Sequence, residues 1–325
     1  MTLPVLGIDI AKATYQVELQ KGSQRYTAEF ANQPAEFRRL TAWLKKHGAR
    51  QVHACMEATG RYSDDLAGYL HDTGQTVSVV NPYQIKAYAK SQLTRNKTDR
   101  LDANVIADFC RTQQPAVWTP PAPEVRELQE LVHQYETLQV QRQQIKNRLA
   151  AGFKSPVVLA QLQTQLALLD EQLQKLQQSL HDHIQQHPDL KRQQALLESI
   201  PGIGAVTAAK LQAMEPLRFA DARAISAFGG VSPMIQTSGT SVHRRTKLSK
   251  MGDPHLRQAL YMPAISAKRF NPIVKAFCDR LAVRGKHPMA IIGAAMHKLL
   301  VLAYGVLKSG KPFEPDYRPA APVAA

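Results

Sequence analysis

The order of strand and helix patterns in the first 113 residues constrains the fold more than any other feature. Three adjacent strands are followed by two strand–helix units and a further helix. We expect strands at Val5–Ile10, Tyr15–Leu19, Arg25–Phe30, Gln51–Glu57 and Thr76–Val80, and helices from Pro34, at Arg61–His71, at Pro82–Lys90 and from Asp99 to about Gln113. Neighbouring antiparallel strands followed by βα units give a mixed sheet with helices on its faces. The predicted class is therefore α/β.

Acidic residues stand at three places in this pattern. Asp9 lies inside the first apolar strand, Glu57 ends the fourth, and Asp99 and Asp102 begin the last helix. A charged group in a buried strand is costly unless it is paired or bound to a metal. In such a sheet, strand ends and a helix packed beside them can bring acids from distant parts of the chain together.

The stretch Asn96–Asn104 carries the closest acidic pair. Asp99 and Asp102 are three residues apart and precede apolar residues at helical spacing, so both should project from one face of a helix's first turn. Two converging carboxylates repel each other, and a hard divalent cation relieves that repulsion. Arg95 and Lys97 beside them suit a phosphodiester substrate. The alternative is an ordinary solvated helix start, where the helix dipole favours acids.

A proline-rich linker then leads into two leucine-rich helices. Leu128–Leu149 follows a three-four spacing in which Arg142 occupies one position, and Leu159–Leu180 repeats that spacing without a gap. An apolar stripe with a 3.5-residue period is typical of a coiled-coil seam. Since Gly152 and Pro156 separate the two helices, we expect an antiparallel hairpin that also pairs with another subunit. A plain helical spacer is the alternative.

A glycine turn follows the leucine seams. Pro201-Gly-Ile-Gly204 lies between two short helical patterns, as in a helix-hairpin-helix motif. Backbone N–H groups at such a turn can bind a phosphate without any side chain. Gly202 and Gly204 are therefore candidate contacts for sequence-independent DNA binding, although a tight packing turn between helices explains the same glycines.

Two serines precede a strongly basic run. Ser238-Gly-Thr-Ser241 offers a nucleophile where phosphate would be gathered, but the same residues also make an ordinary turn. A serine needs a base or a metal for activation, and no partner is evident in the adjacent residues. A helix capped by Asp253 and running through Leu260 is expected next. The candidate phosphate-binding residues of this region are Arg244, Arg245, Lys247, Lys250 and, facing outward, Arg257.

Charge supports a polyanionic partner. The chain has 325 residues, a formal net charge of +15 and a pI near 9.8. Residues 238–311 alone carry 14 basic and 2 acidic residues, which is a localised footprint and favours nucleic acid over a membrane surface.

Targeting and redox signals are weak in this sequence. Three cysteines without metal-ligand spacing suit a reducing intracellular compartment. No signal peptide is expected from the start of the sequence. No apolar run reaches the ~20 residues of a membrane span, and the apolar stretch Ala290–Leu307 is predicted to be a buried helix.

Several motifs occurring together resemble the insertion sequence 110 transposases, the group that includes the Piv-type DNA invertases. The resemblance runs from residue 5 to about 313, and its motifs occur in the family's order with compatible spacing. They are Gly7-Ile-Asp9-Ile-Ala-Lys12, Glu57-Ala-Thr-Gly60, Lys97-Thr-Asp99-Arg-Leu-Asp102-Ala103, Ser199-Ile-Pro-Gly-Ile-Gly204, Ser238-Gly-Thr-Ser241 and Leu256-Arg-Gln-Ala-Leu260.

The resemblance implies a domain organisation. It comprises a RuvC-like, RNase H-type α/β domain at 1–115, a linker and α-helical coiled coil at 116–190, a mainly α-helical transposase domain at 191–313 and a flexible tail at 314–325.

The resemblance also implies a mechanism. Asp9, Glu57, Asp99 and Asp102 would form a DEDD set that binds Mg²⁺, and Ser238 would be the serine that forms a covalent phosphoserine link to the cleaved strand. Donor and target DNA, a structured bridge RNA that guides the enzyme, and further copies of the chain, in a dimer to tetramer, are the implied partners. Mg²⁺ bound near Ser238 would supply the activation that its neighbours lack. A cytoplasmic, nucleoid-associated bacterial protein is the implied setting.

Three rival interpretations stay open at this point. A RuvC-like nuclease or junction resolvase shares the acids but uses metal-activated water and needs no serine. A sugar kinase or actin-like ATPase also begins with Gly7-Ile-Asp9 on a first strand, but it would need further glycine-rich phosphate loops. A non-enzymatic DNA-binding coiled-coil protein explains the charge and the seams but not an acid within the first strand.

Overall fold

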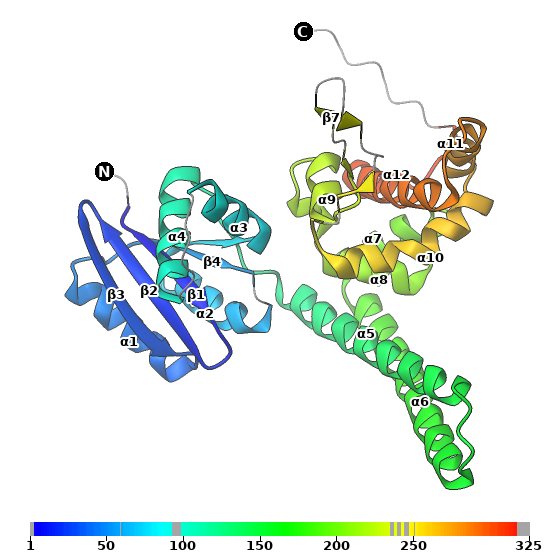
Figure 1. The fold of residues 1–325 in the computed structure, drawn as a ribbon, viewed down its shortest axis with the longest axis horizontal. Helices are drawn as coiled ribbons and strands as arrows, with labels where there is room; N and C mark the ends of the chain where they lie inside the picture. The colour runs from blue at the N-terminus through cyan, green and yellow to red at the C-terminus, as the bar shows by residue number, and fades with distance from the viewer. Residues whose placement is uncertain are drawn as a thin grey trace. The chain divides into compact units, whose positions relative to one another are not determined.

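A computed structural model describes residues 3–58, 60–92, 99–234, 237–238, 242–243, 247–249 and 251–316. Within these ranges, nothing is described of the side chains of residues 61, 99–101, 237–238, 242–243 and 247. The chain divides into two compact units, Met1–Pro121 and Ala122–Ala325 (Figure 1).

The first unit contains a five-stranded mixed sheet in the order β3-β2-β1-β4-β5. Its strands β1, β2 and β3 are antiparallel neighbours, whereas β1 pairs with β4, and β4 with β5, in parallel. The mixed sheet expected from the sequence is therefore confirmed. Its strands are β1 (Val5–Ile10), β2 (Thr14–Lys21), β3 (Gln24–Ala31), β4 (His53–Glu57) and β5 (Thr76–Val80).

Helices cover both faces of this sheet. One face buries residues such as Leu6, Ile8 and Val17 together with apolar side chains of α1 and α2. The opposite face carries Val5 and Cys55, which pack in one cluster with α3 and α4. Alternation of side chains along each strand produces this division. The helices are α1 (Pro34–Lys46), α2 (Arg61–Asp72), α3 (Pro82–Ser91) and α4 (Asp99–Gln113).

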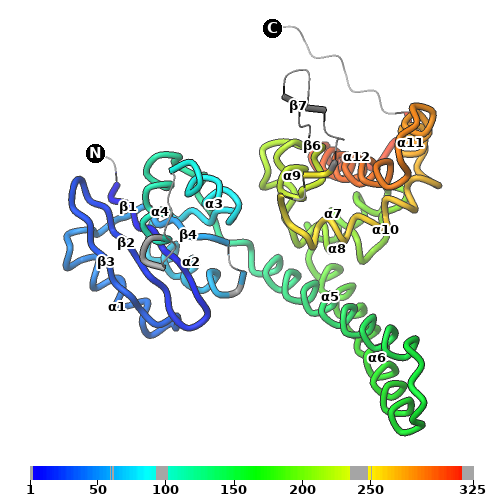
Figure 2. The backbone as a smooth tube through the Cα atoms, viewed as in Figure 1, coloured from blue at the N-terminus to red at the C-terminus, as the bar shows by residue number. Residues whose placement is uncertain are grey.

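The second unit begins with a long helical hairpin. Helix α5 (Pro123–Ala150) packs along α6 (Pro156–Gln186). The two helices are antiparallel, because His183 near the end of α6 donates to the carbonyl of Glu124 at the start of α5. Figure 2 shows the two helices running side by side. The expected hairpin is present, whereas a supercoil and pairing with another subunit stay predictions.

The leucine stripes form the hairpin's interior. Leu128, Leu138, Leu173 and Leu180 are buried in one cluster with further apolar residues of both helices. Arg142, the polar residue in the α5 stripe, forms an ion pair with Asp170 of α6. The arginine that interrupts the apolar stripe of α5 is therefore paired with an acidic residue of α6.

The rest of the unit is a helical bundle around one apolar core. Helix α12 supplies a large share of that core, which explains why Ala290–Leu307 is so apolar. Among the described helices it alone is long and apolar enough to cross a membrane, but it is mostly buried here. The helices are α7 (Pro188–Glu198), α8 (Ala205–Ala213), η1 (Pro216–Arg218), α9 (Ala222–Phe228), α10 (Pro254–Phe270), α11 (Pro272–Val283) and α12 (Pro288–Ser309).

Helix α10 differs from the sequence expectation. Asp253 caps it as expected, accepting hydrogen bonds from the N–H groups of His255 and Leu256. The helix does not end near Leu260, however, but continues through Pro263 to Phe270. Proline removes one helical hydrogen bond, and here apolar burial of Pro263 and the turn after it offsets that loss.

The C-terminal segment is only partly described. The N–H of Phe313 donates to Ser199 Oγ at 2.8 Å, and the Phe313 side chain packs against the helical core. Residue 313 therefore belongs to the folded unit. Most of the expected tail, residues 317–325, lies outside the described residues.

Candidate functional site

Helix α4 crosses strand β1 at Gly7 with almost no space between them. A Cβ added to Gly7 would lie 2.2 Å from the carbonyl oxygen of Ala103 and 2.4 Å from the nitrogen of Ala107. Only a glycine fits beneath this helix. The contact fixes which face of the sheet α4 covers and which β1 positions lie on that face.

The direction of α4 brings its first turn toward the Asp9 end of β1. Asp108 lies beside Gln20, whose strand partner is Val5, whereas Ala103 and Ala107 lie over Gly7. Going back from Ala103 to the first residue of α4 covers about 6 Å of helix. Going forward from Gly7 to Asp9 covers about 6.6 Å of strand. The start of α4 and the Asp9 end of β1 therefore reach the same end of the sheet.

Asp9 and Glu57 occupy matching positions on neighbouring strands. β1 and β4 are parallel and pair Gly7 with Cys55 and Ile8 with Met56, so Asp9 and Glu57 follow at the ends of this register. Both residues share the face of Gly7 and Cys55, the face that α4 covers, because side chains alternate along a strand. Both side chains are half-buried.

Asp102 lies on the side of α4 that faces β4. It precedes Ile106 by one helical turn, and Ile106 packs in a cluster with Cys55 of β4. The Asp102 side chain is half-buried, and the side chain of Asp99 is outside the described part. The backbone thus brings the positions of Asp9, Glu57 and Asp102 to one end and one face of the sheet.

Oxygen ligands of this kind suit a hard divalent cation. Within the described side chains, however, no three groups from Asp, Glu, His and Cys gather closely enough to hold one metal ion. Asp99 is not among those side chains. The donor chemistry and the backbone placement therefore fit a metal, whereas a closed set of ligands is not formed by the described side chains alone.

Two buried thiols lie beneath these acids. Cys55 on β4 and Cys110 on α4 are 0% and 1% exposed. The neighbouring thiol of Cys55 and the contact with His53 lower the pKa of Cys110 to about 6, against the opposing effect of burial. The same pairing and burial raise the pKa of Cys55. These side chains pack between β4 and α4, and the nearby Glu57 carboxylate adds to the rise in the pKa of Cys55.

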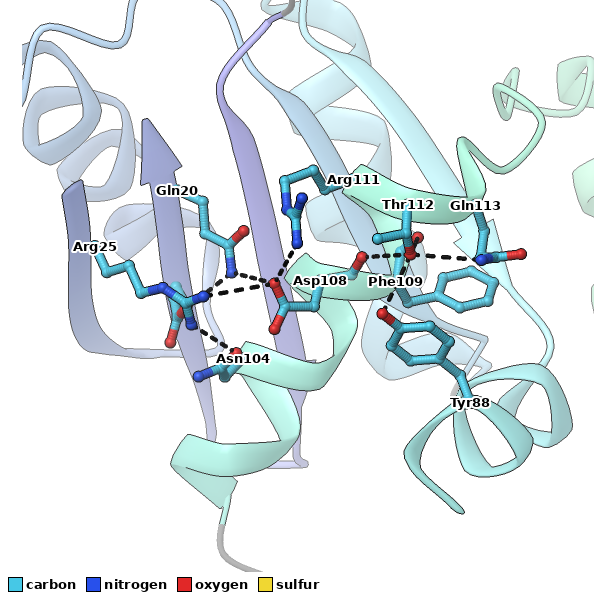
Figure 3. A network of polar contacts seen from close by, with 10 residues as sticks. Gln20, Arg25, Tyr88, Asn104, Asp108, Phe109, Arg111, Thr112 and Gln113 are labelled. Atoms are coloured by element: carbon cyan, nitrogen blue, oxygen red, sulfur yellow. Dashed lines mark hydrogen bonds and ion pairs between the residues drawn. The ribbon is translucent and has the colours of Figure 1, made fainter. Parts of the chain in front are cut away.

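A polar network on the same face was not expected from the sequence. Glu18 and Gln20 alternate with apolar residues in β2, a pattern typical of a solvent-facing edge, yet they are only 3% and 6% exposed. Gln20 Nε2 donates to Glu18 at 3.1 Å and to Asp108 of α4 at 3.2 Å, and Arg25 of β3 joins them (Figure 3). The sequence held no signal for this network, because it depends on where α4 packs.

The glycine turn of the second unit has two different glycines. Gly202 has a φ of +106°, and a Cβ there would lie 2.7 Å from the Cβ of Ala267 on α10. Asn271, which is fully buried, donates to the carbonyl of Pro201 at 3.3 Å. Gly202 is therefore needed for packing on α10, as the alternative interpretation of the turn had it. Gly204 is exposed and has open space where a Cβ would stand, at the start of α8.

The serine segment is described only in its backbone. Ser238 lies in the short strand β7 (Thr237–Ser238), which pairs antiparallel with β8 (Val242–His243), and Ser238 stands opposite Val242. Ser241 lies outside the described residues. Ser238 belongs to the second unit and the acids to the first.

Of the predicted phosphate-binding residues with side chains, the structure describes Arg257 in full and Lys247 in its backbone. Arg257 is half-buried rather than facing outward, because its Nη1 donates to the carbonyl of Gly229 at 3.3 Å. Lys247 lies in β9 (Lys247–Leu248), which pairs with β6 (Pro233–Met234), and its side chain is not described. The remaining candidates, Arg95, Lys97, Arg244, Arg245 and Lys250, lie outside the described residues.

Comparisons with known proteins place the chain among transposases. A family model described as Transposase, of the DEDD type of IS110 elements, matches residues 6–155. A second model, described as the transposase IS116/IS110/IS902 family, matches residues 194–279. The first match spans the strands and helix that carry the four acids, and the second spans the glycine turn, the serine segment and α10.

Curated relatives agree with these family models. The pilin gene-inverting proteins of Moraxella bovis and Moraxella lacunata are each 32% identical over 97% of this chain and 98% of their own length. An uncharacterized 43.6 kDa protein of insertion element IS110 from Streptomyces coelicolor is 27% identical over 49% of this chain and 38% of its own length.

The fold and these similarities define an enzyme of DNA recombination. The chain belongs to the IS116/IS110/IS902 family of transposases. It is thus a DNA transposase or DNA invertase, an enzyme that cleaves and rejoins DNA strands. Its DEDD-type domain indicates dependence on a divalent metal ion.

Proposed function

We propose that this chain is an RNA-guided DNA recombinase that uses a Mg²⁺-binding acidic site and a serine nucleophile. The observation that carries the proposal is the placement of Asp9, Glu57 and Asp102 at one end and on one face of the first unit's sheet. These acids come from two parallel strands and a helix, which is the arrangement expected of a RuvC-like, RNase H-type domain with a DEDD set.

The four acids would hold the metal ion. Asp9, Glu57, Asp99 and Asp102 supply only carboxylate oxygens, the ligands that Mg²⁺ prefers. When bound, Mg²⁺ neutralises charge on a phosphoryl group and lowers the pKa of a coordinated hydroxyl. The half-buried position of three of these acids favours this role, because a fully buried set would exclude the DNA phosphate and a fully exposed set would gain less from binding a cation.

Ser238 would make the covalent link. Its hydroxyl oxygen attacks the phosphorus of one phosphodiester, the hydroxyl proton passes to solvent, and the bond to the leaving strand oxygen breaks. The leaving oxygen takes up a proton and becomes a strand-end hydroxyl. Attack by a strand-end hydroxyl on the phosphoserine reverses these steps and rejoins DNA. No ATP is needed, because each step exchanges one phosphodiester for another.

Nucleic acids and further subunits would complete the site. The segment 238–311, which includes Ser238, carries 14 basic residues and would bind a polyanion. In this proposal a structured bridge RNA pairs with donor and target DNA, and the acids of one subunit meet the serine of another. The α5–α6 hairpin is the proposed element for subunit pairing, as a dimer or tetramer. A cytoplasmic, nucleoid-associated setting suits these partners.

Strand cleavage by acid variants tests the metal site. We expect Asp102→Asn to abolish Mg²⁺-dependent cleavage of element-end DNA, supplied with candidate flanking RNA, while binding of DNA or RNA persists. Asp65→Asn is the matched control, because Asp65 is an exposed carboxylate of the same unit. Undiminished cleavage by Asp102→Asn would refute the acidic site.

A further inference from the structure

Helix α4 and strand β1 cross each other through small residues. At the crossing, Gly7 meets Ala103 and Ala107, so backbone lies against backbone with no large side chain between them. Such a surface sets the distance between helix and strand. At the crossing itself no side chain interlocks, so the constraint on how far the helix is shifted or rotated must come from contacts beside it. The apolar cluster with Ile106 and Cys110 lies toward β4 and is one such contact, but apolar packing is non-directional.

Arg25 supplies directional contacts beside this crossing. From β3, its Nη1 lies 3.4 Å from Glu18 Oε1 of β2 and donates to Asn104 Oδ1 of α4 at 3.1 Å. Its Nη2 lies 3.7 Å from Asp108 Oδ1, also on α4 (Figure 3). Asn104 and Asp108 are one helical turn apart on the same side of α4. One planar guanidinium therefore links two strands to two successive turns of the helix.

Glu18 holds the guanidinium in place. The Glu18 residue is only 3% exposed, and its carboxylate has Gln20 and Arg25 as hydrogen-bonding partners. An ionised carboxylate buried without a cation is costly, so Arg25 has a strong preference for this position although half of its side chain is exposed. Arginine suits the task because its donors form a rigid fork, which an ammonium group lacks.

The network lies next to the proposed ligands along the same helix. Asn104 follows Asp102 by two residues and Asp99 by five. A slip of α4 by one residue would shift these acids by about 1.5 Å. Mg²⁺ sites tolerate far less, since the bonds are about 2.0–2.1 Å and nearly octahedral.

From this geometry we propose that Arg25 is a positioning residue for the acidic site. It fixes the register of α4 on the sheet, through Asn104 and Asp108, and so sets where Asp99 and Asp102 present their carboxylates to a divalent cation. This inference rests on the proposed metal site and adds to it a group that contacts neither metal nor DNA.

Binding of Mn²⁺ alone to the purified full-length chain, followed by electron paramagnetic resonance, tests the inference without any DNA reaction. We expect Arg25→Gln to raise the Mn²⁺ dissociation constant about tenfold, which corresponds to about 1.4 kcal/mol. Arg111→Gln is the matched control, because Arg111 Nη2 lies 3.3 Å from the same Asp108 oxygen but links α4 only to itself. It should bind Mn²⁺ as the wild type does.

Two further variants separate positioning from general stability. Asn104→Ala removes the hydrogen bond from Arg25 to α4 and keeps the ion pair with Asp108, so no buried charge is left unpaired, and alanine favours a helix. It should weaken Mn²⁺ binding several-fold while its thermal unfolding midpoint stays at the wild-type value. Arg25→Lys keeps the charge beside Glu18 but not the fork, so it should regain most of the stability lost in Arg25→Gln and little of the Mn²⁺ affinity.

The outcomes distinguish this inference from the proposed function. Wild-type Mn²⁺ affinity in both Arg25→Gln and Asn104→Ala, with binding lost in Asp102→Asn, would overturn the positioning role and leave the metal site standing. Wild-type affinity in Asp102→Asn would overturn the metal site itself, and the positioning role with it.

Discussion

Two helical contacts in this molecule differ in what accompanies their apolar packing. Helix α4 crosses the sheet through glycine and alanine and buries an apolar cluster toward β4, and a network of hydrogen bonds and ion pairs from Glu18, Arg25 and Asp108 lies beside this contact. The α5–α6 hairpin instead buries a stripe of leucines, with one ion pair between Arg142 and Asp170. Apolar burial is strong but non-directional, whereas hydrogen bonds to a rigid guanidinium specify geometry.

The difference between the two contacts agrees with the role that each region has in the proposed function. The start of α4 carries two acids of the proposed site, where displacements of an ångström matter. In the proposed function the hairpin brings subunits together, a task that tolerates small shifts along its length. We therefore expect substitutions in the two regions to have different effects on the free energy of unfolding. At α4 the loss should depend on which polar or steric contact is removed, and in the hairpin it should scale with the apolar area that the side chain buries.

The largest effect is expected at the α4 crossing. Gly7→Val should lower the free energy of unfolding by about 3 kcal/mol or more, because its Cβ would overlap the Ala103 carbonyl and α4 cannot rise without losing its contacts. Gly68→Ala is the control, since nothing lies within 4 Å of a Cβ at that glycine of α2. Urea unfolding measures both, and an equally stable Gly7→Val protein would show that the crossing is not tight.

A second test exchanges each region's arginine for leucine. Arg25→Leu should cost about 3 kcal/mol, because the carboxylate of Glu18 stays buried without its cation. Arg142→Leu should change stability by less than about 1 kcal/mol, since leucine continues the stripe and Asp170 is 45% exposed. Chemical unfolding measures both variants. An equal loss in the free energy of unfolding would contradict the proposed difference between the two contacts.

Within the hairpin, cost should follow burial. Leu173→Ala is expected to destabilise the chain by about 2–3 kcal/mol, because Leu173 is 7% exposed in the hairpin's core. Leu168→Ala on the same helix should stay within about 0.5 kcal/mol, since Leu168 is 53% exposed. A larger loss for Leu168 than for Leu173 would mean that the outer face of α6 is covered, as subunit pairing would require.

The smallest expected effect concerns that pairing. Leu166 is half-buried within one chain, so Leu166→Asp should weaken self-association more than it weakens folding. Light scattering across protein concentrations measures the association, with circular dichroism as a check on the fold. A wild-type chain that is monomeric at every concentration would contradict pairing through the hairpin.

Local sequence patterns were enough to locate most elements of the first unit. Apolar runs and the prolines at the starts of helices placed the strands and helices within a few residues, and the mixed sheet followed from their order. Glu18 and Gln20 were missed because alternation along β2 distinguishes two faces but not whether a helix covers the polar one.

Predictions in the second unit depended more on tertiary packing. The sequence suggested an end for α10 near Leu260, but burial of Pro263 and Ala267 carries the helix further. Gly202 and Gly204 looked equivalent in the sequence, and only the proximity of Ala267 separates a packing role from an open turn. The acids could be selected by type and order, whereas their common end of the sheet needed the pairing of β1 with β4.

The most direct test of the central claim is a trapping experiment. The chain is incubated with element-end DNA, candidate flanking RNA and Mg²⁺, then denatured and examined for a protein–DNA adduct, with Ser238→Ala and Ser241→Ala alongside. The account predicts an adduct in the wild type and in Ser241→Ala that is absent in Ser238→Ala. Cleavage without any adduct, unchanged by Ser238→Ala, would contradict the serine mechanism and identify a metal-dependent nuclease that uses water.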